Sequence, residues 1–182
     1  MKKILLFTLF TFCIATLSFA QYPSSKMVVL VKGGKVKLNK KDVSKEWKLT
    51  TFTASIDTNS RKKDGTSNKI HSYDNLGIVL FETAVAKVPT GLVGEFQLFL
   101  DATEASKSNP KDFYEGKLTI EKMDFTRKTA IEEIRTKLKD YKETDSEEND
   151  KYRFSKDGIY IYFLYNKAKL LSKVTFGKDK VK

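Results

Sequence analysis

The stretch Gly116–Leu138, GKLTIEKMDFTRKTAIEEIRTKL, carries the clearest local signals of secondary structure in the chain. Lys117–Ile120 alternates polar and apolar residues, which is typical of a half-buried strand. Thr129 and Glu132 fit a capping box, in which the threonine hydroxyl accepts from the third amide of a helix. Three apolar residues then recur at the spacing of one helix face: Ile131, Ile134 and Leu138. The stretch therefore predicts a strand followed by a short helix.

An earlier stretch, Gly34–Ile56, resembles this one when it is shifted by 82 positions, so that Gly34 falls on Gly116. Leu49–Ile56 alone is rich in residues that favour strands. Because its counterpart is more clearly helical, we predict a helix here as well. The shift aligns apolar residues of both elements: Val36 with Leu118, Leu38 with Ile120, Leu49 with Ile131, Phe52 with Ile134 and Ile56 with Leu138.

Strand signals surround both predicted helices. Gly33-Gly34 lies between two β-rich runs and favours a two-residue hairpin, because both glycines can take positive φ. Polar segments at 57–69 and 143–150 are expected to be loops. Three further strands are expected after each helix: around His71–Tyr73, Ile78–Phe81 and Glu95–Leu100 in the first half, and at Tyr152–Phe154, Ile159–Tyr165 and Leu170–Phe176 in the second.

These elements predict an α+β fold, built as a tandem duplication of a β-α-β-β-β unit. We expect an antiparallel sheet with one short helix in each half. Asn109-Pro110 marks the boundary, so the first half spans residues 21–110 and the second spans residues 111–182. Neither half can bury its helix and sheet well alone at this size, so we expect the two halves to form one compact domain.

Residues 1–20 have the pattern of a secretory signal peptide. A positive start at Lys2-Lys3 precedes an apolar run, Ile4–Leu17, and Ser18-Phe19-Ala20 supplies the small residues of a cleavage site. We therefore expect export to the periplasm or secretion. Cys13 is the only cysteine and leaves with the signal, so the mature chain has no disulfide. No other apolar run approaches the roughly 18 residues that a membrane span requires.

The residue combinations that catalysis or metal binding requires are missing from the sequence. His71 is the only histidine, and its place in a strand favours a structural or surface role. Zinc sites need clusters of His or Cys. The chain also has no Gly-x-Ser-x-Gly elbow and no glycine loop for phosphate or dinucleotide. We therefore expect no catalytic residue, no metal and no cofactor, with a pair among the 23 acidic residues as the catalytic alternative.

The formal net charge of +11 restricts the possible partners. A basic exported protein is attracted to anionic surfaces such as lipid headgroups and acidic glycans, or to an acidic protein. The lysines are interleaved with acids, however, which favours an ordinary solvated surface. Export and the lack of a recognised motif argue against nucleic acid.

Three aromatic residues are candidates for an interaction face: Tyr160, Tyr162 and Trp47. The period of two along a strand places Tyr160 and Tyr162 on one face and the neighbouring Ile159, Ile161 and Phe163 on the other. A tyrosine-bearing sheet face among lysines suits a protein or glycan partner. Burial of this face is the alternative for the tyrosines, and core packing is the alternative for Trp47.

Tyr73-Asp74-Asn75-Leu76-Gly77-Ile78 resembles a Tyr-x-x-Leu-Gly-Ile signature in uncharacterised exported proteins of Gram-negative bacteria, a domain of unknown function. Their second half opens with a Gly-x-Leu-x-Ile segment, as Gly116, Leu118 and Ile120 do here. That resemblance implies no catalytic residues. The duplicated layout is also similar, at the level of fold alone, to the β-lactamase inhibitor proteins.

We therefore expect an exported, non-enzymatic module that binds a protein of the cell envelope or has a structural role there. Two alternatives remain at this point. One is a carboxylate-dependent hydrolase of an envelope or extracellular polymer. The other is a binder of anionic lipid or glycan that works through its lysines.

Overall fold

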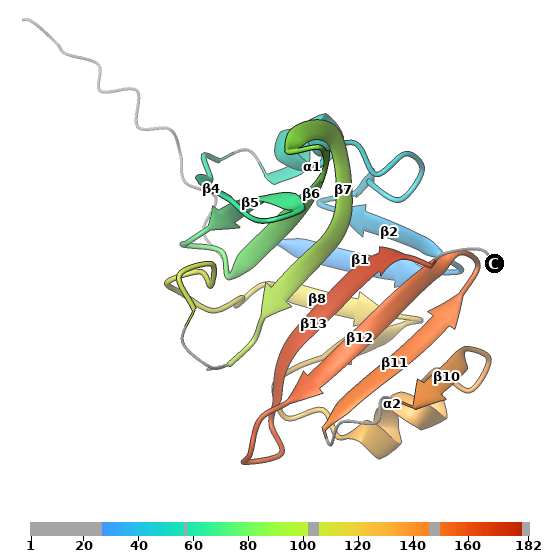
Figure 1. Cartoon of the computed structure of the whole chain (residues 1–182). Helices are drawn as coiled ribbons and strands as arrows, with labels where there is room; N and C mark the ends of the chain where they lie inside the picture. The colour runs from blue at the N-terminus through green and yellow to red at the C-terminus, as the bar shows by residue number, and fades with distance from the viewer. Residues whose placement is uncertain (1–26, 57, 102–105, 146–149, 180–182) are drawn as a thin grey trace, which may run out of the picture.

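The computed structural model describes residues 27–56, 58–101, 106–145 and 150–179, and these form two β-sheets with two short helices (Figure 1). The expected signal peptide at residues 1–20 lies outside the described residues. The five-stranded sheet has the order β3 (Lys41–Asp42), β2 (Lys35–Leu38), β1 (Val28–Lys32), β8 (Lys117–Ile120) and β9 (Met123–Phe125). The eight-stranded sheet has the order β10 (Lys142–Asp145), β11 (Lys151–Lys156), β12 (Ile159–Tyr165), β13 (Leu171–Lys178), β7 (Val88–Phe99), β6 (Ile78–Val85), β5 (Asn68–Tyr73) and β4 (Arg61–Asp64).

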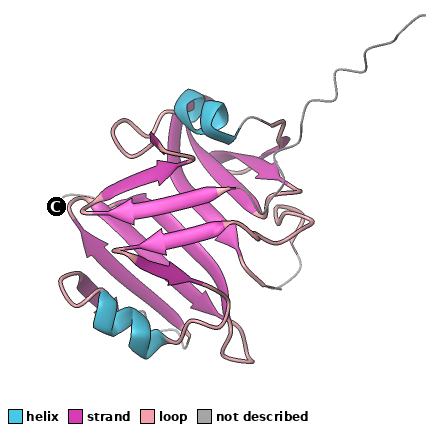
Figure 2. Ribbon diagram, turned by 180° about the vertical axis from the view of Figure 1, so that it is seen from behind, coloured by secondary structure: helices cyan, strands magenta, loops and turns pink. Residues whose placement is uncertain are grey.

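The main hydrophobic core contains side chains from both sheets and both helices. Phe125 of β9 stacks on Phe163 of β12 with ring centroids 5.7 Å apart, which joins one sheet to the other. Helix α1 (Leu49–Ile56) contributes Phe52, whose ring lies 5.8 Å from that of Phe96. Helix α2 (Ile131–Lys137) contributes the fully buried Ile134. The two helices lie at opposite ends of the molecule (Figure 2).

The predicted α+β duplication is wrong, because the described chain is mostly β and its two helices have only eight and seven residues. The shift of 82 positions places Lys35–Leu38 on Lys117–Ile120, but these strands have different neighbours. The first forms β2 and pairs with β1 and β3, whereas the second forms β8 and pairs with β1 and β9. Alternation of polar and apolar residues reports only that a strand is half buried, so it could not distinguish these two positions.

Two polar edge strands, β4 and β10, lie in segments for which the sequence predicted loops. β4 covers part of the segment that was expected to be a loop, and all four of its residues are exposed. β10 likewise includes the start of the expected acidic loop. An edge strand that is exposed to solvent on both faces does not need alternating polar and apolar residues. The pattern that usually predicts a strand is therefore absent.

The hairpin at Gly33-Gly34 is confirmed. β1 and β2 pair antiparallel on either side of it, and the two glycines have φ of 53° and 69°. β1 also pairs in parallel with β8, which lies almost ninety residues further along the chain. β7 and β13 pair antiparallel at the centre of the larger sheet, so strands from both expected halves meet in each sheet.

The helix at Leu49–Ile56 is also confirmed, with Phe52 and Ile56 fully buried. The capping box at α2 is wrong. The N-cap is Ala130 and receives no side-chain hydrogen bond, because the Thr129 hydroxyl instead accepts from the amide of Thr126. No helix among the described residues is long and apolar enough to cross a membrane.

Candidate functional site

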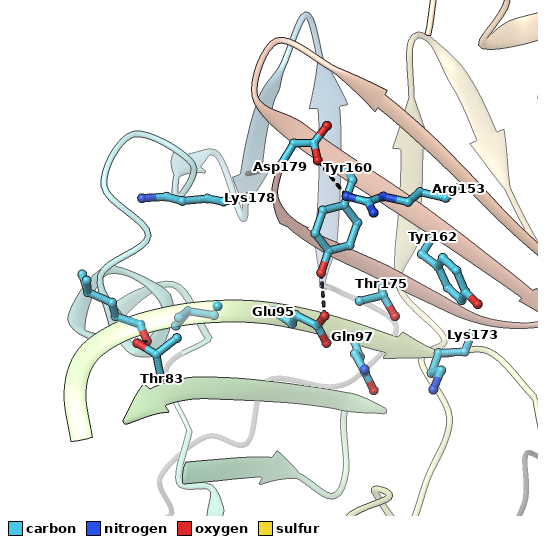
Figure 3. A pocket seen from close by; sticks show the side chains of 13 residues that line it. Thr83, Glu95, Gln97, Arg153, Tyr160, Tyr162, Lys173, Thr175, Lys178 and Asp179 are labelled. Carbon is cyan, nitrogen blue, oxygen red and sulfur yellow. Dashed lines mark hydrogen bonds and ion pairs between the residues drawn. The ribbon is translucent and has the colours of Figure 1, made fainter. Parts of the chain in front are cut away.

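A groove of about 980 Å³ lies on the face of the eight-stranded sheet that points away from the core. We call it the outer groove. Its lining comes from β6, β7, β11, β12 and β13 and from Asp179, which follows β13. Its polar and aromatic side chains include Glu95, Gln97, Arg153, Tyr160, Tyr162, Lys173, Thr175 and Asp179, which Figure 3 shows together with others.

Strand alternation explains why the groove is polar although it lies directly above the core. Along β12, Ile159, Ile161 and Phe163 are buried in the core, so Tyr160 and Tyr162 point to the opposite face. The register then aligns side chains across neighbouring strands. One row consists of Arg153, Tyr162, Thr175 and Gln97, and the next consists of Ser155, Tyr160, Gly177 and Glu95.

Tyr160 is held by contacts on both faces of its ring and at its hydroxyl. Gly177 lies beneath the ring, so closely that a methyl group on Gly177 would overlap the ring and hydroxyl of Tyr160. The guanidinium carbon of Arg153 lies 4.4 Å from the ring centroid, a cation–π contact. The hydroxyl donates to Glu95 Oε1 at 2.6 Å. Burial, and after it the hydrogen bond to the Glu95 carboxylate, raises the pKa of Tyr160.

Arg153 is positioned by a carboxylate beyond the end of β13. Its Nη2 donates to Asp179 Oδ1 at 2.7 Å, and Figure 3 shows Asp179, Arg153 and Tyr160 side by side. The Nε of Arg153 is buried and has no acceptor among the described residues. Arg153 and Asp179 therefore neutralise each other, while the buried Nε donor of the guanidinium remains unused.

The other part of the groove has polar side chains that are not bonded to one another. The structure gives no hydrogen bond of the Tyr162 hydroxyl, the Gln97 amide or the Thr175 hydroxyl to a described residue. It also gives Lys173 no ion pair within that part of the chain. Thr175 is only 5% exposed, and burial raises the pKa of Tyr162. These four side chains come from three adjacent strands and lie close together in Figure 3.

The three aromatic residues proposed from the sequence have three different environments. Tyr162 lines the open part of the outer groove, and Tyr160 lines it as a covered ring. Trp47 is 2% exposed and packs in the core, with its ring 5.8 Å from that of Phe52. The structure therefore brings the two tyrosines together and places Trp47 elsewhere.

His71 belongs to a separate buried cluster on the core-facing side of β5. Its Nε2 lies 2.9 Å from Glu82 Oε2, and both side chains are at most 6% exposed. The other Glu82 oxygen accepts from the Gly91 amide, and the Ser60 hydroxyl lies 3.5 Å from His71 Nδ1. The pair links β5, β6 and β7, and neither residue lines the outer groove. This arrangement is consistent with a structural role for His71.

Among the described residues, no group of three or more His, Cys, Asp or Glu side chains could hold a metal ion. In the groove, Glu95 and Asp179 are the two carboxylates, and each already accepts a hydrogen bond from the neighbouring Tyr160 or Arg153.

Six polar residues that are central to this site were not identified from the sequence: Glu95, Gln97, Arg153, Lys173, Thr175 and Asp179. The alternation from Glu95 to Leu100 did predict a strand, so it also predicted that Glu95 and Gln97 share a face. What the sequence could not predict was the pairing of β7 with β13, which places Glu95 within reach of Tyr160.

The described residues form a two-sheet β protein with a groove of polar and aromatic side chains on the outer face of its larger sheet. Residues 28–135 match a family described as a domain of unknown function, DUF7738. That match covers more than half of the chain, and the chain belongs to this family. It includes the groove residues of β6 and β7, Glu95 and Gln97 among them, but ends before β11, β12, β13 and Asp179, which supply the rest of the groove. No curated protein and no solved structure matches the chain.

Proposed function

We propose that this protein is an exported, non-enzymatic binding module that holds a segment of another cell-envelope protein in the outer groove. The observation that carries the proposal is a set of four neighbouring polar side chains that make no hydrogen bond or ion pair with a described residue: Gln97, Tyr162, Lys173 and Thr175. These side chains line an open groove, so a ligand that enters it can supply the hydrogen-bond partners that the fold does not provide.

The composition of the groove supports a protein as the ligand. Tyrosine and arginine are among the residues that contribute most to binding at protein interfaces. The ring of Tyr160 and the Arg153–Asp179 pair are already held in place by their contacts with one another. They form a preorganised part of the groove surface, which lowers the entropy cost of binding. Beside these residues, Tyr162 adds an aromatic ring with an unused hydroxyl.

Export rests on sequence patterns. Residues 1–20 have the order of charge, apolar run and small residues that a signal peptide requires. The Tyr-x-x-Leu-Gly-Ile signature at Tyr73–Ile78 supports the same proposal through its resemblance to exported proteins.

A second candidate is a carboxylate-dependent hydrolase, because Glu95 and Asp179 line the same groove. Both carboxylates are engaged, the first by the Tyr160 hydroxyl and the second by Arg153. An acid–base pair needs one carboxyl group that can donate a proton to the leaving group. Hydrolysis of an envelope polymer that is abolished by both Glu95→Gln and Asp179→Asn would replace the binding proposal with this one.

The anionic-surface alternative involves a different face. Lys32, Lys35 and Lys37 point away from the core on β1 and β2. Vesicles that contain anionic lipid would then co-sediment with the protein at low salt and release it as salt screens the charges. Lys35→Gln combined with Lys37→Gln would weaken that binding if this face were responsible.

Site-specific photo-crosslinking tests the binding proposal directly. A photoreactive amino acid replaces Tyr162 in the groove or Phe113, which is 44% exposed outside it, and the cells that express the protein are irradiated. We expect a discrete protein adduct from position 162 and a much weaker one from position 113. Equal adducts from both positions, or none from position 162, would contradict the proposal.

A further inference from the structure

We propose that the segment held in the outer groove carries one acidic side chain, and that Lys173 binds its carboxylate with help from the groove's neutral donors. This inference rests on the proposed function and specifies the chemistry of the partner. Asp or Glu within the segment is the group that we infer.

Lys173 is a half-buried cation that lacks a counter-ion within the described residues. It extends from β13 on the groove face, next to Phe99 of β7 in the sheet register. Its ammonium lies 5.5 Å from the centroid of the Phe99 ring, and this cation–π contact is the interaction that the structure gives it. A weak contact of this kind offsets only part of the cost of removing an ammonium group from water.

The electrostatics of the site agree with this geometry. Burial lowers the pKa of Lys173, and Lys151 acts in the same direction. Glu95 opposes the shift, but its carboxylate already accepts the short hydrogen bond from Tyr160. A carboxylate that binds next to Lys173 would restore the charged ammonium, because an opposite charge at close range favours ionisation.

Neutral donors surround the position where such a carboxylate would lie. Thr175 precedes Gly177 on the same face of β13 and pairs in register with Tyr162 on one side and Gln97 on the other. Figure 3 shows Lys173, Tyr162, Thr175 and Gln97 around one part of the groove. A hydroxyl or amide that donates to a carboxylate makes a charge-assisted bond, which is stronger than a neutral one.

The charge balance of the groove selects a single negative charge. Its lining has three cations, Arg153, Lys173 and Lys178, and two anions, Glu95 and Asp179. Since Asp179 already pairs with Arg153, a phosphate or a repeating acidic glycan would place further negative charge beside Glu95 without a matching cation. One acidic side chain in a protein segment supplies the counter-ion that Lys173 lacks and adds no further negative charge.

Peptide display tests this inference. Random short peptides are selected against the wild-type protein, Lys173→Gln and the charge reversal Lys173→Glu, and each variant's fold is checked by circular dichroism. Tyr162→Ala identifies the peptides that bind in the groove, and Lys37→Gln on the other sheet is the matched lysine control. We expect groove-dependent peptides with one dominant acidic position. Lys173→Gln should weaken them about tenfold or more, and Lys37→Gln should not.

The charge reversal gives the sharpest outcome, because Lys173→Glu should select Lys or Arg at the position where the wild type selects Asp or Glu. Groove-dependent peptides without an acidic preference would overturn this inference and leave the proposed function standing. A failure to select any peptide that depends on Tyr162 would overturn both. Tighter binding of an oligogalacturonate than of the peptides would replace the protein partner with a glycan.

Discussion

At the scale of single residues, Tyr160 and Tyr162 show what a sequence pattern can and cannot predict. Their alternation with buried residues correctly placed both on the face of β12 opposite the core. It could not predict that Tyr160 is covered and Tyr162 open. That difference depends on Gly177 beneath one ring, Arg153 above it and Glu95 at its hydroxyl, and each of these lies on another strand.

Gly177 is the residue on which the position of Tyr160 depends. In Gly177→Ala the new methyl group would displace the ring, so we expect the free energy of unfolding to fall by about 1–3 kcal/mol, as in other overpacked sites. Urea denaturation measures this change. Placed on a Tyr160→Ala background the same substitution should cost far less, because the ring is gone. An equal cost on both backgrounds would show that the contact is unimportant.

Trp47 is expected to serve the core and not a partner. Trp47→Ala should lower the free energy of unfolding by about 3–5 kcal/mol, since it leaves a cavity next to Phe52. The exposed Phe113→Ala is the matched aromatic control and should cost far less. Circular dichroism during thermal unfolding compares the two. A stable Trp47→Ala protein that no longer binds its partner would instead make Trp47 an interaction residue.

At the scale of elements, the sequence predicted the parts that carry a local signal. The β1–β2 hairpin follows from two glycines that can take positive φ. The helix α1 was predicted by analogy with the clearer helical signal of Ile131–Leu138, because the residues of Leu49–Ile56 alone also favour a strand. The polar edge strands β4 and β10 were missed because they bury no apolar face. β4 is nevertheless fixed by Arg61, which makes a bidentate pair with Asp74 and also donates to the carbonyls of Lys107 and Asn109.

Arg61 therefore fastens the segment 106–112 to the edge of the larger sheet. In Arg61→Gln we expect the amide of Asp112, which donates to the Asp74 carbonyl, to exchange with solvent about tenfold faster or more. Hydrogen–deuterium exchange measures this protection. Lys63→Gln on the same exposed strand is the control and should leave it unchanged. Equal exchange in both variants would refute the role of Arg61.

At the scale of the whole molecule, the pairings that build the fold lie far apart in sequence. β1 pairs with β8, and β7 pairs with β13. Alternation predicts that a strand is half buried but not which strand lies beside it, so neither the two sheets nor the groove across β7, β13 and β12 could be predicted. The apparent duplication misled for the same reason, because it compared local patterns and not neighbours.

Buried tyrosines make the whole fold sensitive to alkaline pH. Burial raises the pKa of Tyr73 to about 12 and also raises the pKa of Tyr114 and Tyr165. The unfolded chain releases these protons near pH 10, roughly, while the folded chain keeps them. Their contribution to stability is therefore complete below that pH and is lost as the pH rises through the folded-state pKa values.

We expect the urea midpoint to fall steeply above about pH 10, with tyrosinate absorbance appearing together with unfolding. Tyr114→Phe should be less stable at neutral pH, because its hydroxyl donates to the carbonyls of Met27 and Lys117. Its stability should also fall less steeply with pH, because one ionising group is gone. A midpoint that stays constant from neutral to strongly alkaline pH would contradict this prediction.

The central claim is that the outer groove is the binding surface, and amide chemical-shift mapping by NMR tests it most directly. The labelled protein is titrated with the partner segment captured at position 162. The account predicts that the largest shifts fall on β7, β12 and β13 around Gln97, Tyr162 and Lys173, and that Lys35 and Lys37 of β2 do not move. Largest shifts on the five-stranded sheet, with the groove unchanged, would contradict it.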